Sequence, residues 1–112
     1  MNEYQLKLAT QTQLRDTRNS LTELEYLLAV EKLPAKDQRV AALNLSNVHL
    51  AYQKILTTEL KDLRTGLSAN EADLLAGIKS VNKALKKLKN AKNIINTVSA
   101  FLKVVGRVVK LF

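Results

Sequence analysis

Residues 65–71, TGLSANE, divide the chain into a front part and a strongly basic rear part. Ser68 and Glu71 have the S-x-x-E spacing of a capping box, in which each side chain accepts a hydrogen bond from the other residue's free backbone amide. Gly66 is a residue type that commonly ends a helix. The stretch therefore predicts that one helix ends near Gly66 and that another begins near Ala69.

The composition of the whole chain favours long helices. Its 112 residues are 46% hydrophobic and 4% aromatic, with three Gly and one Pro. So few turn residues disfavour a sheet protein, and a core of Leu, Val, Ile and Ala is typical of helical bundles. We expect a single all-α domain, because 112 residues rarely support two cores.

Two helices are expected before this stretch, over residues 2–32 and 35–66. Leucines and a threonine at 3-4-3-4 spacing line one face of the first, and Leu33-Pro34 ends it because Pro disfavours a helical conformation in the residue before it. The two helices, each about 46 Å long, should form an antiparallel hairpin. The two stripes are Leu14, Thr17, Leu21, Leu24 and Leu28, and then Leu45, Val48, Tyr52, Ile55 or Leu56, Leu60, Leu63 and Leu67.

A third helix is expected over residues 69–112, giving a three-helix bundle or a coiled-coil-like arrangement. An unbroken helix of this length would measure about 66 Å and would outreach the hairpin by roughly 20 Å. Its apolar stripe changes phase between Leu88 and Ala91. We therefore expect either a bend near residues 90–93 or a straight end that projects beyond the hairpin.

Almost all of the net charge of +8 lies in this last third. Residues 1–67 carry nine basic and eight acidic residues, whereas residues 68–112 carry nine basic residues against Glu71 and Asp73. Such asymmetry indicates a negatively charged partner. The expected face for an acidic partner comprises Lys79, Lys83, Lys86, Lys87, Lys89 and Lys92.

Residues 94–112 combine a wide apolar surface with a narrow basic stripe of Lys103, Arg107 and Lys110. A helix apolar over so much of its circumference is either buried against protein or lies in lipid. Lys103 would sit near the centre of a bilayer, which disfavours a lone membrane-spanning helix. The expected partner or membrane contacts are Ile94, Ile95, Val98, Phe101, Leu102, Val105, Val108, Val109 and Phe112.

The residue types and their spacing do not predict a catalytic, metal or cofactor site. The chain has no Cys and a single His, His49, which we interpret as an ordinary surface residue. Glu59 and Asp62 share a helical face but are best interpreted as solvated charges. The three Gly residues are isolated, so no phosphate-binding loop is expected. We expect neither an enzyme, nor a cofactor, nor a small-molecule substrate.

Three functions remain. The preferred hypothesis is a non-enzymatic assembly or adaptor protein that associates with itself or with another protein through the third helix. The alternative is a membrane-active or membrane-associated, pore-forming-like protein that binds anionic lipid through residues 94–112. Non-specific nucleic-acid binding through the lysine face is weaker, because aromatic residues are few and Lys dominates over Arg. Residues 1–13 have no apolar run of signal-peptide length, so we expect cytoplasmic synthesis and, for the second function, peripheral attachment to a membrane.

Overall fold

Six helices make up the computed structural model, which describes residues 1–111. They are α1 (Glu3–Ser20), α2 (Leu24–Glu31), α3 (Ala35–Thr57), α4 (Leu60–Ala69), α5 (Glu71–Leu85) and α6 (Ala91–Val105). Within the described range the connections contain no strand, so the predicted all-α class is confirmed.

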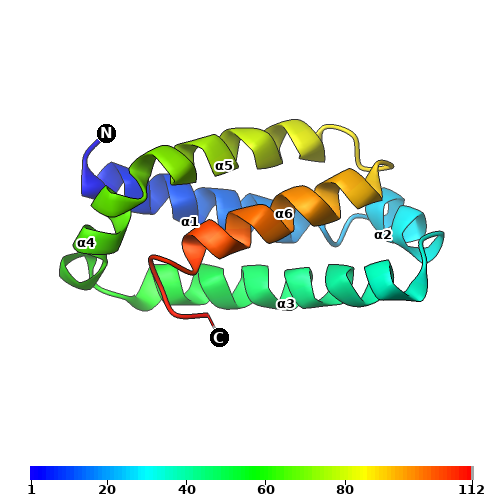
Figure 1. The fold of residues 1–112 in the computed structure, drawn as a ribbon, viewed down its shortest axis with the longest axis horizontal. Helices are drawn as coiled ribbons and strands as arrows, with labels where there is room; N and C mark the ends of the chain where they lie inside the picture. Colours follow the sequence, from blue (N-terminus) through cyan, green and yellow to red (C-terminus); the bar gives the residue numbers. More distant parts are fainter. Residues whose placement is uncertain (112) are drawn as a thin grey trace.

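The four longer helices lie along the long axis of the molecule, with α2 at one end and α4 at the other (Figure 1). α6 packs against both α5 and α3, and α1 packs against α3. The principal dimensions are 43 × 25 × 18 Å. A continuous third helix of about 66 Å would not fit within them, and the expected three helices are each divided into two.

The first break, between α1 and α2, lies at residues 21–23. The Thr22 hydroxyl donates a hydrogen bond to the Asn19 carbonyl oxygen at 2.8 Å, which closes the end of α1 locally. The chain then changes direction, so the predicted stripe ends early. Leu24 and Leu28 are exposed instead of buried, and Tyr26 enters the core in their place.

The second break separates α3 from α4. α3 begins directly after Pro34, where the sequence predicts a new helix. It ends at Thr57, whose hydroxyl donates to the Gln53 carbonyl oxygen at 2.8 Å, and Thr58 is extended. β-branched residues are poor helix formers, which favours a break at this pair. The Lys7 ammonium then donates to the Thr58 carbonyl oxygen at 3.0 Å and ties the break to α1.

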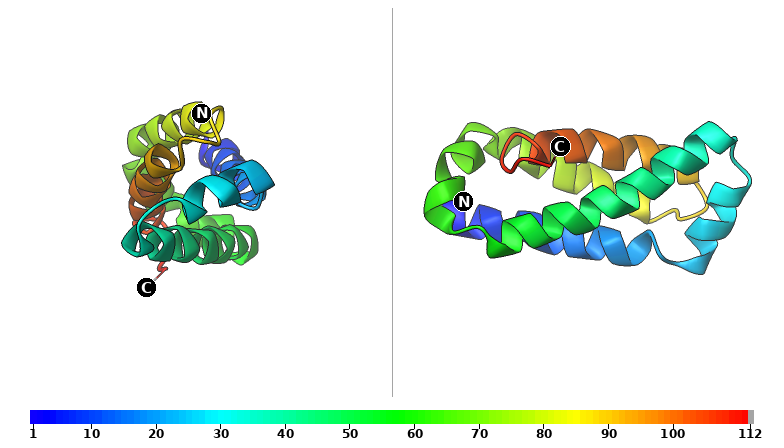
Figure 2. Two further views of the ribbon diagram at one scale, coloured as in Figure 1. Left: turned by 90° about the vertical axis from the view of Figure 1, so that its right-hand side faces the viewer. Right: turned by 90° about the horizontal axis from the view of Figure 1, so that it is seen from below.

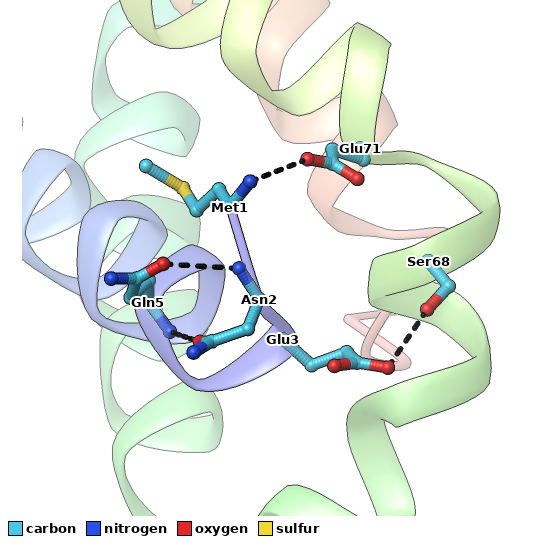
Figure 3. A network of polar contacts seen from close by, with 6 residues as sticks. All are labelled: Met1, Asn2, Glu3, Gln5, Ser68 and Glu71. Carbon is cyan, nitrogen blue, oxygen red and sulfur yellow. Dashed lines mark hydrogen bonds and ion pairs between the residues drawn. The ribbon is translucent and has the colours of Figure 1, made fainter.

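The predicted capping box at Ser68 and Glu71 is wrong. Ser68 lies inside α4, and α5 follows it with only Asn70 between them. Both side chains reach the start of α1 instead (Figure 3): the Ser68 hydroxyl donates to the Glu3 carboxylate at 3.4 Å, and Glu71 lies 3.8 Å from the terminal amine of Met1. Packing against α1 therefore overrides the local capping preference.

A capping box does form at the first helix of the chain. The Gln5 amide donates to the Asn2 side-chain oxygen at 2.8 Å, and the Asn2 amide donates to the Gln5 side-chain oxygen at 3.1 Å (Figure 3). The two side chains satisfy two of the free amides that every helix start carries.

The third break lies at residues 86–90, close to the predicted bend at residues 90–93. It is a complete reversal, after which α6 runs back along α5 (Figure 1). The Asn90 amide donates to the Lys87 carbonyl oxygen at 3.0 Å within this turn. Folding back buries Ile94, Val98 and Phe101, which a straight helix would have left uncovered.

Several polar side chains lie in the core, and most of them are paired. The Asn44 amide of α3 donates to the Ile95 carbonyl oxygen of α6 at 3.1 Å and accepts from the Ser99 hydroxyl at 3.2 Å. The hydroxyls of Thr10 and Tyr26 are buried without a hydrogen-bond partner among residues 1–111. Burial raises the pKa of the Tyr26 phenol above its usual value of 10.0.

Candidate functional site

The apolar residues of the C-terminal segment lie inside the molecule. The sequence predicts more apolar surface there than the hairpin can cover, but α3 and α5 enclose α6 and this premise is wrong. A role of these residues as partner or membrane contacts stays a prediction. Val108 is half-buried, and Phe112 lies outside the described residues. The buried members of the expected set are Ile94, Ile95, Val98, Phe101, Leu102, Val105 and Val109.

The basic stripe of Lys103, Arg107 and Lys110 is exposed, as its polarity requires. The Arg107 guanidinium donates to the Asp73 carboxylate of α5 at 3.0 Å. The Lys54 ammonium of α3 donates to the backbone carbonyl oxygen of Lys110. The segment after α6 is therefore held to α5 through Arg107 and to α3 through Lys54, and Asp73 neutralises one of its charges.

All six lysines of the expected acidic-partner face are exposed. Lys92 forms an ion pair with Asp37 at 2.7 Å, and that carboxylate is largely covered. The other five lie on α5 and in the turn after it, and among residues 1–111 none of them has an acidic group within ion-pair distance. The structure thus places five cations without an ion pair, within the described part of the chain, on one edge of the bundle.

An open groove runs between α5 and α6 on the outer side of the bundle. One half has a volume of about 560 Å³, with Asp73 and Arg107 at its far end and Phe101 in its floor. The other half has a volume of about 400 Å³ and ends at Lys83 and Lys87. The two halves share Ser80 and Thr97, so the groove is continuous. Its floor is otherwise built from small residues: Ala76, Gly77, Ser80, Ala84, Thr97 and Ala100.

Gly77 explains why the two helices approach so closely. A Cβ atom at this position would lie 2.6 Å from Cδ1 of the Phe101 ring, far inside the van der Waals distance. The ring occupies the space that a side chain on α5 would otherwise take. In the sequence Gly77 is one of three isolated glycines, and neither it nor the apolar spacing of α6 gives a signal for the groove.

A second exposed feature was not predicted. Leu24, Leu27 and Leu28 are 68%, 42% and 48% exposed and share one face of α2. A groove of about 710 Å³ joins Glu25 of α2 to residues 85–90. Figure 2 shows this turn beside α2 at the end of the bundle. The exposed leucines therefore stand at the same end of the molecule as the lysine-rich turn.

The remaining candidate residues have ordinary surroundings. His49 is exposed, with its Nδ1 3.4 Å from the Arg18 guanidinium, which in turn stacks 4.9 Å above the Tyr52 ring. Glu59 precedes α4 at the N-cap position, makes no side-chain capping hydrogen bond, and pairs with the exposed Lys61 at 3.4 Å. No group of three or more His, Cys, Asp or Glu residues converges among residues 1–111.

Across the portion of the chain that the structure describes, none of the helices combines the length and the apolar character needed to cross a bilayer. In comparisons with known proteins, no family model, no curated protein and no solved structure matches the chain.

Proposed function

We propose that the protein is a non-enzymatic adaptor that binds an acidic helical segment of a partner protein in the groove between α5 and α6. One observation carries this proposal: the groove is open, and its rim lysines Lys83 and Lys87 have no acidic partner among residues 1–111. It keeps the expected association through the rear third of the chain, and moves the contact from the apolar face of α6 to its outer side.

Charge supports an acidic occupant. From Leu74 to the end of the chain there is no acidic residue. Asp73, at one end of the groove, is taken up by its ion pair with Arg107, so the rim at Lys83 and Lys87 has no counter-charge from the residues that line the groove. A field of one sign attracts oppositely charged partners and raises their encounter rate. The attraction reaches about 10 Å at 0.1 M salt, so binding should weaken as salt is added.

The dimensions support a helix as the occupant. α5 has 15 residues, which corresponds to a length of about 22 Å or four turns. Small residues in the floor allow a third helix to approach within the 8–10 Å or so between axes that is typical of packed helices. A helix that lays one face into a groove is a common mode of peptide recognition.

The alternative of nucleic-acid binding has weaker support. The rim cations are lysines without neighbouring exposed aromatic rings, whereas single-strand binding sites use stacked aromatics and base-reading sites favour arginine. The absence of Cys and the isolated His49 support the non-enzymatic part of the proposal.

The direct test uses a synthetic helical peptide of Glu, Ala and Leu, with a Gln-for-Glu peptide as the uncharged control. We expect the acidic peptide to bind in low salt and to weaken steadily with added salt. The double variant Lys83→Glu, Lys87→Glu should reduce its affinity by about tenfold or more, because each reversal at the groove rim replaces an attraction with a repulsion. Fluorescence anisotropy with labelled peptide gives the dissociation constants.

Two controls separate the groove from the overall charge. Lys36→Glu, Lys61→Glu makes the same change in net charge at exposed positions away from the groove, and should have little effect. Ala100→Tyr fills the groove without changing the charge and should abolish binding, while Ala42→Tyr, at an exposed position of α3, should not. Equal losses of affinity in the two charge variants, or unchanged binding by Ala100→Tyr, would show that the groove is not the binding site.

A further inference from the structure

The exposed face of α2 has no covering partner within residues 1–111. α2 contributes only Tyr26 to the fully buried core, although it contains Leu24, Leu27 and Leu28. The spacing of these three leucines places them on one side of the helix, opposite Tyr26. They form an exposed face on α2, the helix at one end of the bundle (Figure 1), which we name the α2 leucine face. The exposed Glu31 follows Leu27 and Leu28 at the same helical spacing and borders this face at the end of α2.

Cations flank this face. The turn at residues 86–90 lies beside α2, as the end-on view shows (Figure 2), and it contains the exposed residues Lys86, Lys87 and Lys89. Leu88, in the same turn, is half-buried against the core. The exposed acids of α2 and its cap are Glu23, Glu25 and Glu31; the three turn lysines together with Lys32 and Lys36 outnumber them.

We propose that this end of the molecule docks on an anionic lipid surface. The α2 leucine face enters the boundary between headgroups and acyl chains, and Lys86, Lys87 and Lys89 lie at the lipid phosphates. Exposed apolar side chains beside lysines are the combination that holds peripheral proteins on anionic membranes, because the two contributions add. Lys87 belongs both to this end and to the rim of the groove between α5 and α6, whereas the α2 leucine face belongs to the lipid-docking end alone.

A lipid surface fits this end better than a second copy of the chain does. A stable protein interface buries roughly 800 Å² on each partner, which three leucine side chains cannot supply. The face also occupies the end of a molecule 43 Å long and 18 Å thick, so it is narrow and projecting. A fluid lipid surface accommodates such a shape without a complementary groove.

The test measures binding of the full-length protein to vesicles by co-sedimentation. Vesicles of two parts phosphatidylcholine to one part phosphatidylserine should bind the protein, and vesicles of phosphatidylcholine alone should not. The triple variant Leu24→Ser, Leu27→Ser, Leu28→Ser should lower the partition coefficient by about tenfold or more. Leu8→Ser, Leu43→Ser, Leu56→Ser is the matched control, because these leucines are 42%, 61% and 47% exposed on α1 and α3.

A spectroscopic readout reports insertion directly. The chain has no Trp, so a single Leu28→Trp variant carries the only indole. Its emission should shift to shorter wavelength with phosphatidylserine vesicles, whereas that of Leu43→Trp should not. Equal losses in the two serine variants, an unshifted Leu28→Trp spectrum, or binding to the acidic peptide without any binding to vesicles would overturn the proposal. The leucine triple variant should still bind the acidic peptide, so failure of lipid docking leaves the groove proposal untouched.

Discussion

Gly77 is the residue at which the packing of α5 on α6 is tightest. We expect Gly77→Ala to destabilise the protein by about 1–2 kcal/mol. The added Cβ would lie 2.6 Å from the Phe101 ring, and overpacking of this kind costs typically 1–3 kcal/mol. Alanine is the better helix former by up to about 1 kcal/mol, so the clash outweighs the gain in propensity. Urea denaturation followed by circular dichroism measures the change.

A double variant identifies the cause of this loss. Phe101→Leu alone should destabilise the protein because it leaves space under Gly77. Adding Gly77→Ala to that variant should then raise stability instead of lowering it, since the ring is gone and the helix propensity remains. If the double variant instead lost as much stability as the two single variants together, the ring and the glycine would not interact.

Tyr26 carries a buried hydroxyl without a partner among the described residues, 1–111, and a raised pKa. Below pH 10 the phenol is protonated in both the folded and the unfolded chain, so it adds no pH dependence. Above pH 10.0 the unfolded chain loses the proton while the folded chain retains it, and stability falls as pH rises toward the folded pKa. We expect Tyr26→Phe to remove this alkaline loss.

Tyr26→Phe should also keep or slightly raise stability at neutral pH, because removing an unsatisfied buried hydroxyl relieves a desolvation penalty of about 1–3 kcal/mol. Thermal denaturation at pH 7 and over the alkaline range measures both effects. Tyr4→Phe is the control, since Tyr4 is exposed. A neutral-pH loss of more than about 1 kcal/mol would show that the hydroxyl has a partner after all.

At the scale of elements, α6 is the helix on which the core depends. Ile94, Val98 and Phe101 are fully buried, and each such side chain contributes on the order of 2–5 kcal/mol when truncated to alanine. The total stability of a domain is only about 5–15 kcal/mol. A chain ending at Asn90 should therefore lose its cooperative unfolding transition. Retention of a sharp transition by this truncated chain, measured by calorimetry, would show that α1–α5 form a core of their own.

The helices themselves were largely predictable, and their ends were not. Pro34 places the start of α3 correctly because proline restricts both itself and the residue before it. Ser68 and Glu71 mislead because a capping box is a weak local preference, and both side chains find partners on α1. The reversal at residues 86–90 shows in the sequence only as a change of phase. That the chain reverses completely there, and does not merely bend, follows from the burial of α6 against α3 and α5.

The candidate site also has a part that the sequence predicts and a part that it does not. The exposed lysines were predictable, because a run of cations without acids belongs in solvent. The groove was not, because it depends on Gly77 meeting Phe101 from a different helix. The α2 leucine face has a regular spacing that normally predicts burial. It is exposed because residues 21–23 separate α1 from α2, and the chain changes direction there.

At the scale of the whole molecule, the fold turns a sequence asymmetry into a spatial one. Residues 68–112 carry most of the net charge of +8, and α5 with its following turn places five unpaired lysines on one edge of the bundle. α3 forms the opposite edge in Figure 1 and belongs to the nearly neutral front part of the chain. An anionic surface should therefore meet the molecule in a preferred orientation.

Cation-exchange retention tests this orientation without any knowledge of the partner. Lys79→Gln, Lys83→Gln and Lys36→Gln, Lys61→Gln each lower the net charge by two, from +8 to +6. If retention depended on net charge alone, the two variants would elute together. We expect the first to elute at clearly lower salt, because neighbouring cations bind a charged surface jointly and their field falls off within about 10 Å at 0.1 M salt. Co-elution would mean that the lysine edge does not act as a unit, and both the groove and the lipid-docking end would then lose their electrostatic basis.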